Sequence, residues 1–135
     1  MSLPPDDDDL EDFRRRTWPR KFADALRGIK IAVRGEASYF VHILATAIVV
    51  IAGVISKLSP TRWAVIVLCI ATVLAAESLN TAIERLGRAI TRKHDPQVRD
   101  ALDIASGAVL LAAIGAAVAG AIILLPPLIA MLEKR

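Results

Sequence analysis

Cysteine and histidine are scarce in this sequence, and their scarcity excludes several kinds of protein. The 135 residues include one cysteine, Cys69, and two histidines that lie far apart along the chain. A single cysteine cannot form a disulfide within the chain, and no Cys/His spacing typical of a zinc site is present. We therefore expect neither a disulfide framework nor a structural zinc, and we interpret Cys69 as a packing or lipid-facing residue.

The familiar phosphate-binding loops are also missing. The sequence contains no G-x-x-x-x-G-K-[ST] motif, and no glycine loop accompanied by the H-R-D motif of protein kinases. The net charge of +3 is too small to indicate binding to nucleic acid. We therefore expect neither a P-loop ATPase, nor an ordinary protein kinase, nor a nucleic-acid partner.

Apolar residues, in contrast, are abundant. They make up 55% of the chain, while 23% of the residues are charged, a combination typical of a small membrane protein whose charges lie at the ends of its spans. Residues 1–17 differ, because they are acidic and then basic, without the apolar core of a signal peptide. We expect this segment to be a disordered tail and residues 18–135 to form one membrane domain.

The first predicted element is an amphipathic helix over residues 19–34. Phe22, Leu26, Ile29 and Val33 recur at spacings of four, three and four, which places them on one side of a helix, and basic residues occupy the other side. This pattern is typical of a helix that lies in the membrane interface.

Three apolar segments follow, at about 37–56, 62–88 and 100–131. Each is long enough for a helix that crosses the hydrocarbon core, which takes roughly 20 residues. The third carries a stripe of small residues that suits either packing within the chain or contact between copies. The predicted fold is therefore an all-α membrane protein with an interfacial helix and three transmembrane helices.

The basic residues predict the orientation of these spans. Thirteen Lys and Arg residues lie before the first span or between the second and third, and four lie on the opposite side. The positive-inside rule then places the N-terminus and the second loop in the cytoplasm and the C-terminus outside.

Polar residues at the cytoplasmic end of the second span interrupt its apolar pattern. Glu77, Asn80 and Glu84 have spacings of three and four, so they share one helical face. An ionisable residue within a span is costly and indicates a functional site. Glu36 and Asp103 stand at the cytoplasmic ends of the other two spans, and carboxylates brought together in this way favour bound Mg²⁺.

Such a site suits phosphoryl transfer to a lipid hydroxyl held at headgroup depth. This reaction needs a metal that neutralises phosphates and a group that orients or deprotonates the attacking hydroxyl. His42, within the first span, is interpreted as a hydrogen-bonded packing residue without a role in the chemistry.

The chain resembles the prokaryotic integral-membrane diacylglycerol and undecaprenol kinases over most of residues 20–125. The resemblance rests on ALRGIKIAVRGE in the amphipathic helix, ESLNTAIE in the second span and LDIASGAVLLAA in the third. It implies a homotrimer in the bacterial inner membrane that uses ATP and Mg²⁺ to phosphorylate diacylglycerol or undecaprenol. It further implies that Glu77 is the general base, that Glu36 and Glu84 hold Mg²⁺, and that Asn80 and Asp103 position the nucleotide.

One position departs from the family pattern. Members carry a lysine directly before the aspartate of the third span, where this chain has Leu102. Arg99 lies three residues earlier, on nearly the same helical face, and we expect its guanidinium to bind the phosphates instead. Lys21 and Arg27 of the amphipathic helix are also predicted to bind nucleotide or phosphate, and the sequence does not distinguish ATP from anionic lipid as their partner.

Two other functions are compatible with these residues. The departure at Leu102 would suit a catalytically degenerate membrane protein that binds nucleotide or lipid. A small channel would need polar residues that continue across the bilayer, whereas the second and third spans become apolar toward their outer ends. The lipid kinase is the leading hypothesis.

Overall fold

The protein is all-helical in the computed structural model, which describes residues 15–35 and 37–134. Its helices are α2 (Trp18–Gly35), α3 (Ala37–Ile55), α4 (Pro60–Ile90) and α5 (Pro96–Leu132). The prediction of an all-α fold is confirmed. The second metal ligand predicted from the sequence, Glu36, lies outside the described residues.

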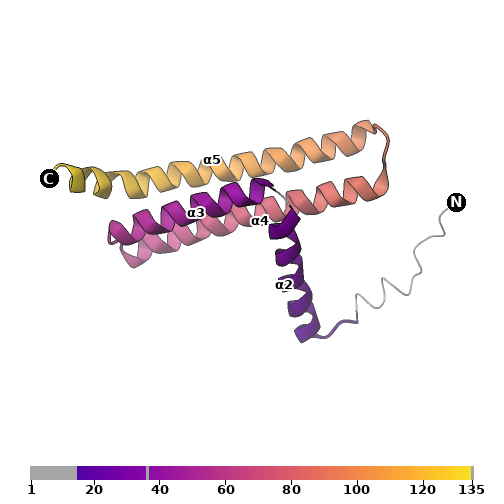
Figure 1. The fold of residues 1–135 in the computed structure, drawn as a ribbon, viewed down its shortest axis with the longest axis horizontal. Coiled ribbons are helices and arrows are strands. Elements are labelled where there is room, and N and C mark those ends of the chain that lie inside the picture. The colour runs from indigo at the N-terminus through magenta and orange to yellow at the C-terminus, as the bar shows by residue number, and fades with distance from the viewer. Residues whose placement is uncertain (1–14, 36, 135) are drawn as a thin grey trace.

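Helices α3, α4 and α5 run side by side, and α2 projects away from one side of them (Figure 1). Helices α4 and α5 are antiparallel and joined by a short connection at one end of the molecule, while the C-terminus lies at the other end. Helix α2 turns by 98° relative to α3. If α3 crosses a membrane, α2 therefore runs along the membrane surface.

Local sequence signals explain where α4 and α5 begin. Pro60 opens α4 after the extended residue Ser59, because proline is pre-organised for the first turn and lacks the N–H that would go unpaired there. Asp95 caps α5 by accepting hydrogen bonds from the backbone N–H groups of Gln97 and Val98. This cap starts α5 at Pro96, four residues before the start of the span expected from hydropathy.

Two helices are by themselves long and apolar enough to cross a membrane. These are α4 and α5; a third span exists by this criterion if the bent pair Trp18–Arg34 and Tyr39–Ile55 is counted as one. The expectation of several membrane-spanning helices is thus confirmed for two segments by length and composition. The remaining predicted span, the first in chain order at about 37–56, corresponds to α3, which is the second member of the bent pair.

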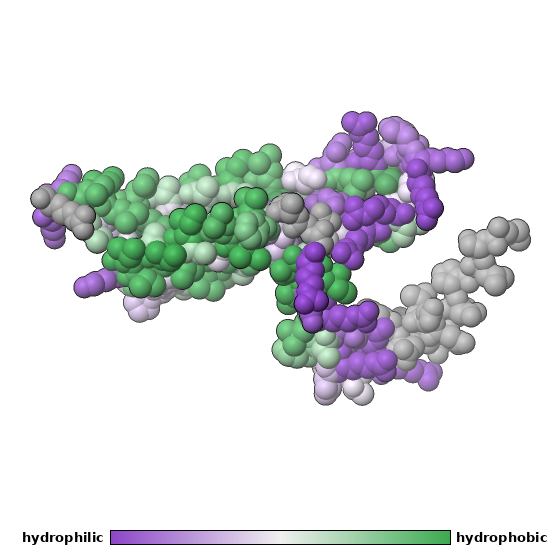
Figure 2. Space-filling model, viewed as in Figure 1, coloured by the Kyte–Doolittle hydropathy of each residue, from purple (hydrophilic) through white to green (hydrophobic). Residues whose placement is uncertain are grey.

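Most of the large apolar side chains lie on the outside of the helices rather than between them. A small core of Leu58, Ile66 and Leu124 is buried at the end where α3 joins α4, whereas side chains such as Leu111 and Ile122 on α5 are largely exposed. Figure 2 shows the apolar surface along the bundle and hydrophilic residues at the α4–α5 connection and on α2. An apolar surface of this extent requires a bilayer or other copies of the chain to cover it.

The close approach of Gly53 to the ring of Trp63 generates a stability prediction. A Cβ at Gly53 would lie 2.8 Å from Trp63 Cη2 and 3.2 Å from Leu58 Cδ1. We expect Gly53→Ala to destabilise the detergent-solubilised protein by about 1–3 kcal/mol, because it overpacks this core. Gly28→Ala is the matched control, since nothing lies within 4 Å of its Cβ position. Equal unfolding midpoints for the two variants would contradict the packing described here.

Candidate active site

The polar residues of α4 lie toward the end of the bundle where α4 turns into α5. Glu77 and Thr81, one turn apart, are each only 2% exposed, and they are the buried polar side chains among the described residues. Asn80 and Glu84 follow on the same side of the helix and are partly exposed. The sequence spacing therefore translates into one polar face whose exposure increases toward the helix end.

Glu77 contacts a residue to which the sequence assigned no role. His42 Nε2 of α3 lies 3.7 Å from Glu77 Oε2, and the His42 side chain is 21% exposed. Nearby, the hydroxyl of Tyr39 and that of Ser78 form a hydrogen bond of 3.2 Å that also joins α3 to α4. The pairing of His42 with Glu77 depends on how α3 is rotated against α4, which no local pattern in the sequence reports.

A chain of hydrogen bonds fixes the carboxylate of Glu84. Asn80 Nδ2 donates to Glu84 Oε1 at 3.0 Å. Ser106 Oγ of α5 donates to the backbone carbonyl of Leu102 at 3.0 Å and lies 3.5 Å from Asn80 Oδ1. The other carboxylate oxygen of Glu84 lies 3.7 Å from Arg88 Nη1. Asn80 thus connects a residue of α5 to the carboxylate that the sequence predicts as a metal ligand.

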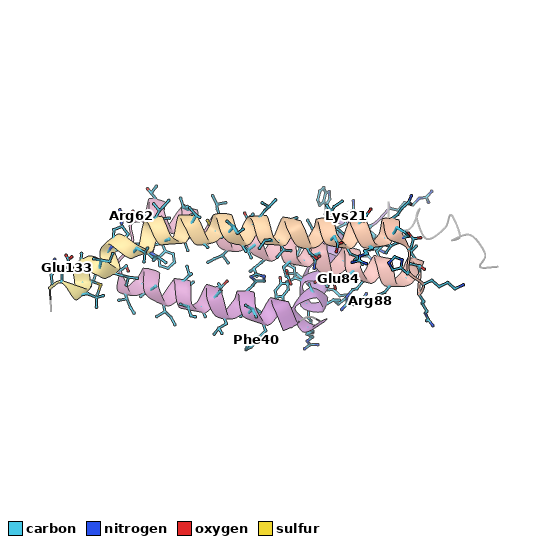
Figure 3. The ribbon with its side chains drawn as sticks, turned by 90° about the horizontal axis from the view of Figure 1, so that it is seen from above. Lys21, Phe40, Arg62, Glu84, Arg88 and Glu133 are labelled. Atoms are coloured by element: carbon cyan, nitrogen blue, oxygen red, sulfur yellow. The ribbon has the colours of Figure 1, made fainter. Side chains whose placement is uncertain are left out.

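Glu84 faces an open cleft of about 780 Å³ formed by the ends of α4 and α5 and their connection. Arg99 and Asp103 line the same cleft, with Arg99 Nε 3.9 Å from Asp103 Oδ2. Figure 3 shows Glu84 and Arg88 toward this end of the bundle and Arg62 and Glu133 toward the other. The cleft therefore gathers carboxylates and guanidinium groups that are far apart in the sequence.

Leu102, at the position of the family lysine, also lines this cleft. Its side chain packs close to Gly87 of α4, where an added Cβ would lie 3.7 Å from Leu102 Cδ2 and 3.2 Å from Val98 Cγ1. Leu102 thus contributes to the contact between α4 and α5. Arg99, one turn away on α5, presents a cation to the same space.

The two predicted cations of α2 lie elsewhere. Lys21 is near the end of α2 that is farthest from the bundle, and its ammonium lies 5.3 Å from the ring centre of Trp18. Arg27 lines a separate hollow together with Arg85 of α4. Of the predicted nucleotide-binding residues, the structure therefore places Asn80, Arg99 and Asp103 near Glu84, and it places Lys21 and Arg27 apart from them.

The described side chains fit a magnesium site only in part. Within residues 15–35 and 37–134, no group of three or more His, Cys, Asp and Glu could hold a metal ion. Mg²⁺ in phosphotransferases often takes one or two carboxylates and completes its shell with phosphate oxygens and water. Glu84 has the appropriate chemistry and stands at the edge of the cleft, which the carboxylate of Asp103 also lines.

Comparison with known proteins identifies the family. Residues 23–124 match the family described as prokaryotic diacylglycerol kinase. The chain belongs to this family. It is 38% identical over 109 residues to the undecaprenol kinase of Bacillus subtilis (strain 168). The aligned residues cover 81% of this chain and 89% of that protein. No solved structure matches the chain.

A second relative is a diacylglycerol kinase. The chain is 32% identical over 112 residues to the protein of that name from Synechocystis sp. (strain ATCC 27184 / PCC 6803 / Kazusa). The aligned residues cover 82% of this chain and 64% of that protein. Family membership and both relatives identify this prokaryotic diacylglycerol kinase family member as a membrane lipid kinase.

The contact between His42 and Glu77 generates a prediction about turnover. We expect His42→Leu to lower kcat by up to about 100-fold with little change in the KM for ATP, because the Glu77 carboxylate loses a contact that helps to orient it. His42→Gln keeps a hydrogen-bond donor and should retain more of the activity. Steady-state kinetics in lipid and a thermal unfolding midpoint would be measured for each variant. If the His42→Leu protein had the same kcat as the parent, the contact between His42 and Glu77 would not contribute to turnover.

Proposed function

We propose that the chain transfers the γ-phosphate of ATP to the hydroxyl of a membrane lipid at the cytoplasmic face of the bacterial inner membrane. The observation that carries this proposal is the arrangement of two carboxylates on α4. Glu77 is buried between helices, and Glu84 is seven residues further along, about 10 Å nearer the helix end, at the cleft. A base at lipid depth and a polar cleft at nucleotide depth are what this reaction requires.

In the proposed mechanism, a carboxylate oxygen of Glu77 accepts the proton of the lipid hydroxyl. The hydroxyl oxygen forms a bond to the γ-phosphorus, the bond from that phosphorus to the bridging β,γ-oxygen breaks, and ADP leaves with the electron pair. Asn80 holds Glu84, while Arg99 and Asp103 position the nucleotide in the cleft. Bound Mg²⁺, for which Glu84 and Glu36 are the proposed ligands, would neutralise charge on the phosphates.

The lipid substrate that we favour is undecaprenol. The more similar of the two relatives named above is an undecaprenol kinase, and the alignment covers 89% of that protein. Diacylglycerol is the second candidate, since the other relative is a diacylglycerol kinase. Both lipids offer a primary hydroxyl at the membrane surface, so the same chemistry serves either one.

The proposed orientation and assembly follow from charge and exposure. The connection between α4 and α5 is rich in basic residues, which favours the cytoplasm for the end that holds the cleft. The apolar outer surface of the helices supports association between copies, and the resemblance to the family makes a homotrimer the assembly that we propose, in which neighbouring copies cover part of each chain. The N-terminus would then be cytoplasmic and the C-terminus external.

Reconstitution in lipid tests the reaction. We expect phosphorylated lipid from undecaprenol in the presence of Mg²⁺ and ATP, and a loss of at least about 100-fold in kcat for Glu77→Gln, because this isosteric change removes the base. Glu133→Gln, at the opposite end of the bundle, is the matched control and should leave kcat unchanged. No product from either lipid, combined with retained nucleotide binding, would favour a catalytically degenerate protein.

The replacement of the family lysine by Leu102 generates a further prediction. Arg99→Ala should lower kcat/KM for ATP by about tenfold or more, since a hydrogen bond to a charged group contributes about 1.5–3 kcal/mol. The charge-matched control is Arg62→Ala, at the other end of the bundle. Adding Leu102→Lys to the Arg99→Ala protein should restore part of the loss. Unchanged kinetics after Arg99→Ala would remove this residue from the site.

A further inference from the structure

A second polar hollow lies between α2 and α4. It encloses about 410 Å³ and is lined by four basic residues and one apolar residue: Arg27, Lys30, Ile31, Arg34 and Arg85. The spacings of three and four among the α2 residues place them on one helical face. The fifth residue, Arg85, belongs to α4, so the hollow is built by two elements that are far apart in the sequence.

No carboxylate of residues 15–35 or 37–134 forms a salt bridge with the cations of this hollow. Among the described residues, salt bridges connect Arg16 to Asp24, Arg88 to Glu84 and Arg99 to Asp103, but none involves a basic residue of the hollow. Like charges held side by side repel one another, and an anion placed between them relieves this repulsion. Guanidinium groups in particular bind phosphate oxygens with charge-assisted hydrogen bonds. The composition of the hollow therefore points to a phosphate.

This hollow is distinct from the cleft proposed for the nucleotide. The two share no lining residue. Arg85 follows Glu84 directly, but consecutive residues of a helix point about 100° apart, so the two side chains face different sides of α4. A phosphate in the hollow would therefore not occupy the space lined by Glu84, Arg99 and Asp103.

The rest of α2 indicates that this phosphate belongs to a lipid. Phe22, Leu26 and Ile29 lie on a different side of α2 from the basic residues, and each is more than half exposed. Figure 2 shows hydrophobic and hydrophilic residues on different sides of this helix. Because α2 runs crosswise to α3, its apolar side can enter the acyl region while its basic side stays at the depth of the headgroups.

We propose that the hollow binds the phosphate of an anionic phospholipid, such as phosphatidylglycerol, from the surrounding bilayer. The lipid phosphate joins the basic face of α2 to Arg85 and so holds α2 against α4. In this proposal, the phosphate that Arg27 binds belongs to a lipid and not to ATP. This site rests on the membrane location of the chain and not on the proposed catalytic chemistry.

Lipid retention by the full-length protein tests the site. The protein would be released from mixed micelles of phosphatidylcholine and phosphatidylglycerol, and bound lipid would be counted by native mass spectrometry. The site variant replaces Lys30, Arg34 and Arg85 with glutamine. The control replaces Lys57, Arg62 and Lys134 at the opposite end with glutamine, so both variants lose the same charge.

We expect the parent and the control to retain phosphatidylglycerol in preference to phosphatidylcholine. The site variant should lose this preference by about 100-fold, since each basic residue near an anionic membrane surface contributes about a factor of five in affinity. Arg85→Gln alone should lower the preference for phosphatidylglycerol by a smaller factor. This single variant tests the site if the triple variant fails to fold.

Two outcomes would overturn the proposal. Equal retention of phosphatidylglycerol by the parent and the site variants would show that the hollow is only a solvated basic surface. Displacement of the lipid by ATP or by inorganic phosphate at equal concentration would show that the hollow takes a free phosphate. The lipid-retention assay does not depend on catalysis. If the parent protein showed no lipid kinase activity, its preference for phosphatidylglycerol could still be measured, so the two proposals can fail separately.

Discussion

The antiparallel packing of α4 against α5 determines where chemistry can take place in this protein. The connection between the two helices spans only residues 91–95, so the last turns of α4 face the first turns of α5. Gly87 allows Val98 and Leu102 to approach the α4 backbone closely. In this register, Ser106 of α5 lies 3.5 Å from the side-chain oxygen of Asn80 on α4. Residues that are far apart in the chain meet at one cleft as a result.

The low dielectric of the membrane gives the polar residues of α4 their significance. Burying a carboxylate in such an environment is costly, and a span that tolerates one usually does so for function. Glu77 is almost fully buried and lies beside His42. The hydroxyl oxygen of Thr81, one turn further, is buried without a hydrogen-bond partner in the described part of the chain.

The sequence predicts those features that depend on a single helix. The apolar segments, the amphipathic pattern of α2 and the shared face of Glu77, Asn80 and Glu84 all follow from local periodicity. Features that depend on how helices are rotated against one another could not be predicted. The contact of His42 with Glu77 is one of these, because a lone histidine in an apolar run does not show which neighbour it faces.

The cap at the start of α5 and the position of Leu102 illustrate two further limits. Hydropathy places the start of a span at the first apolar residues, whereas Asp95 begins the helix earlier by binding backbone N–H groups in a polar stretch. For Leu102, the resemblance to the family predicts a missing cation, but only the structure shows that the leucine packs beside Gly87. A departure from a functional pattern can thus have a structural reason that the pattern does not contain.

Charge pairing separates the two basic regions of the protein. At the cleft, Arg88 and Arg99 each lie near a carboxylate, so the charge of that region is nearly balanced. In the hollow between α2 and α4, none of the basic residues forms a salt bridge with a described acid. A region of unbalanced positive charge binds an anion without needing a metal, and a phospholipid headgroup supplies one wherever a helix lies along the membrane surface. In the two proposals, the phosphate that is transferred and the phosphate that holds α2 against α4 therefore bind in regions of different charge balance.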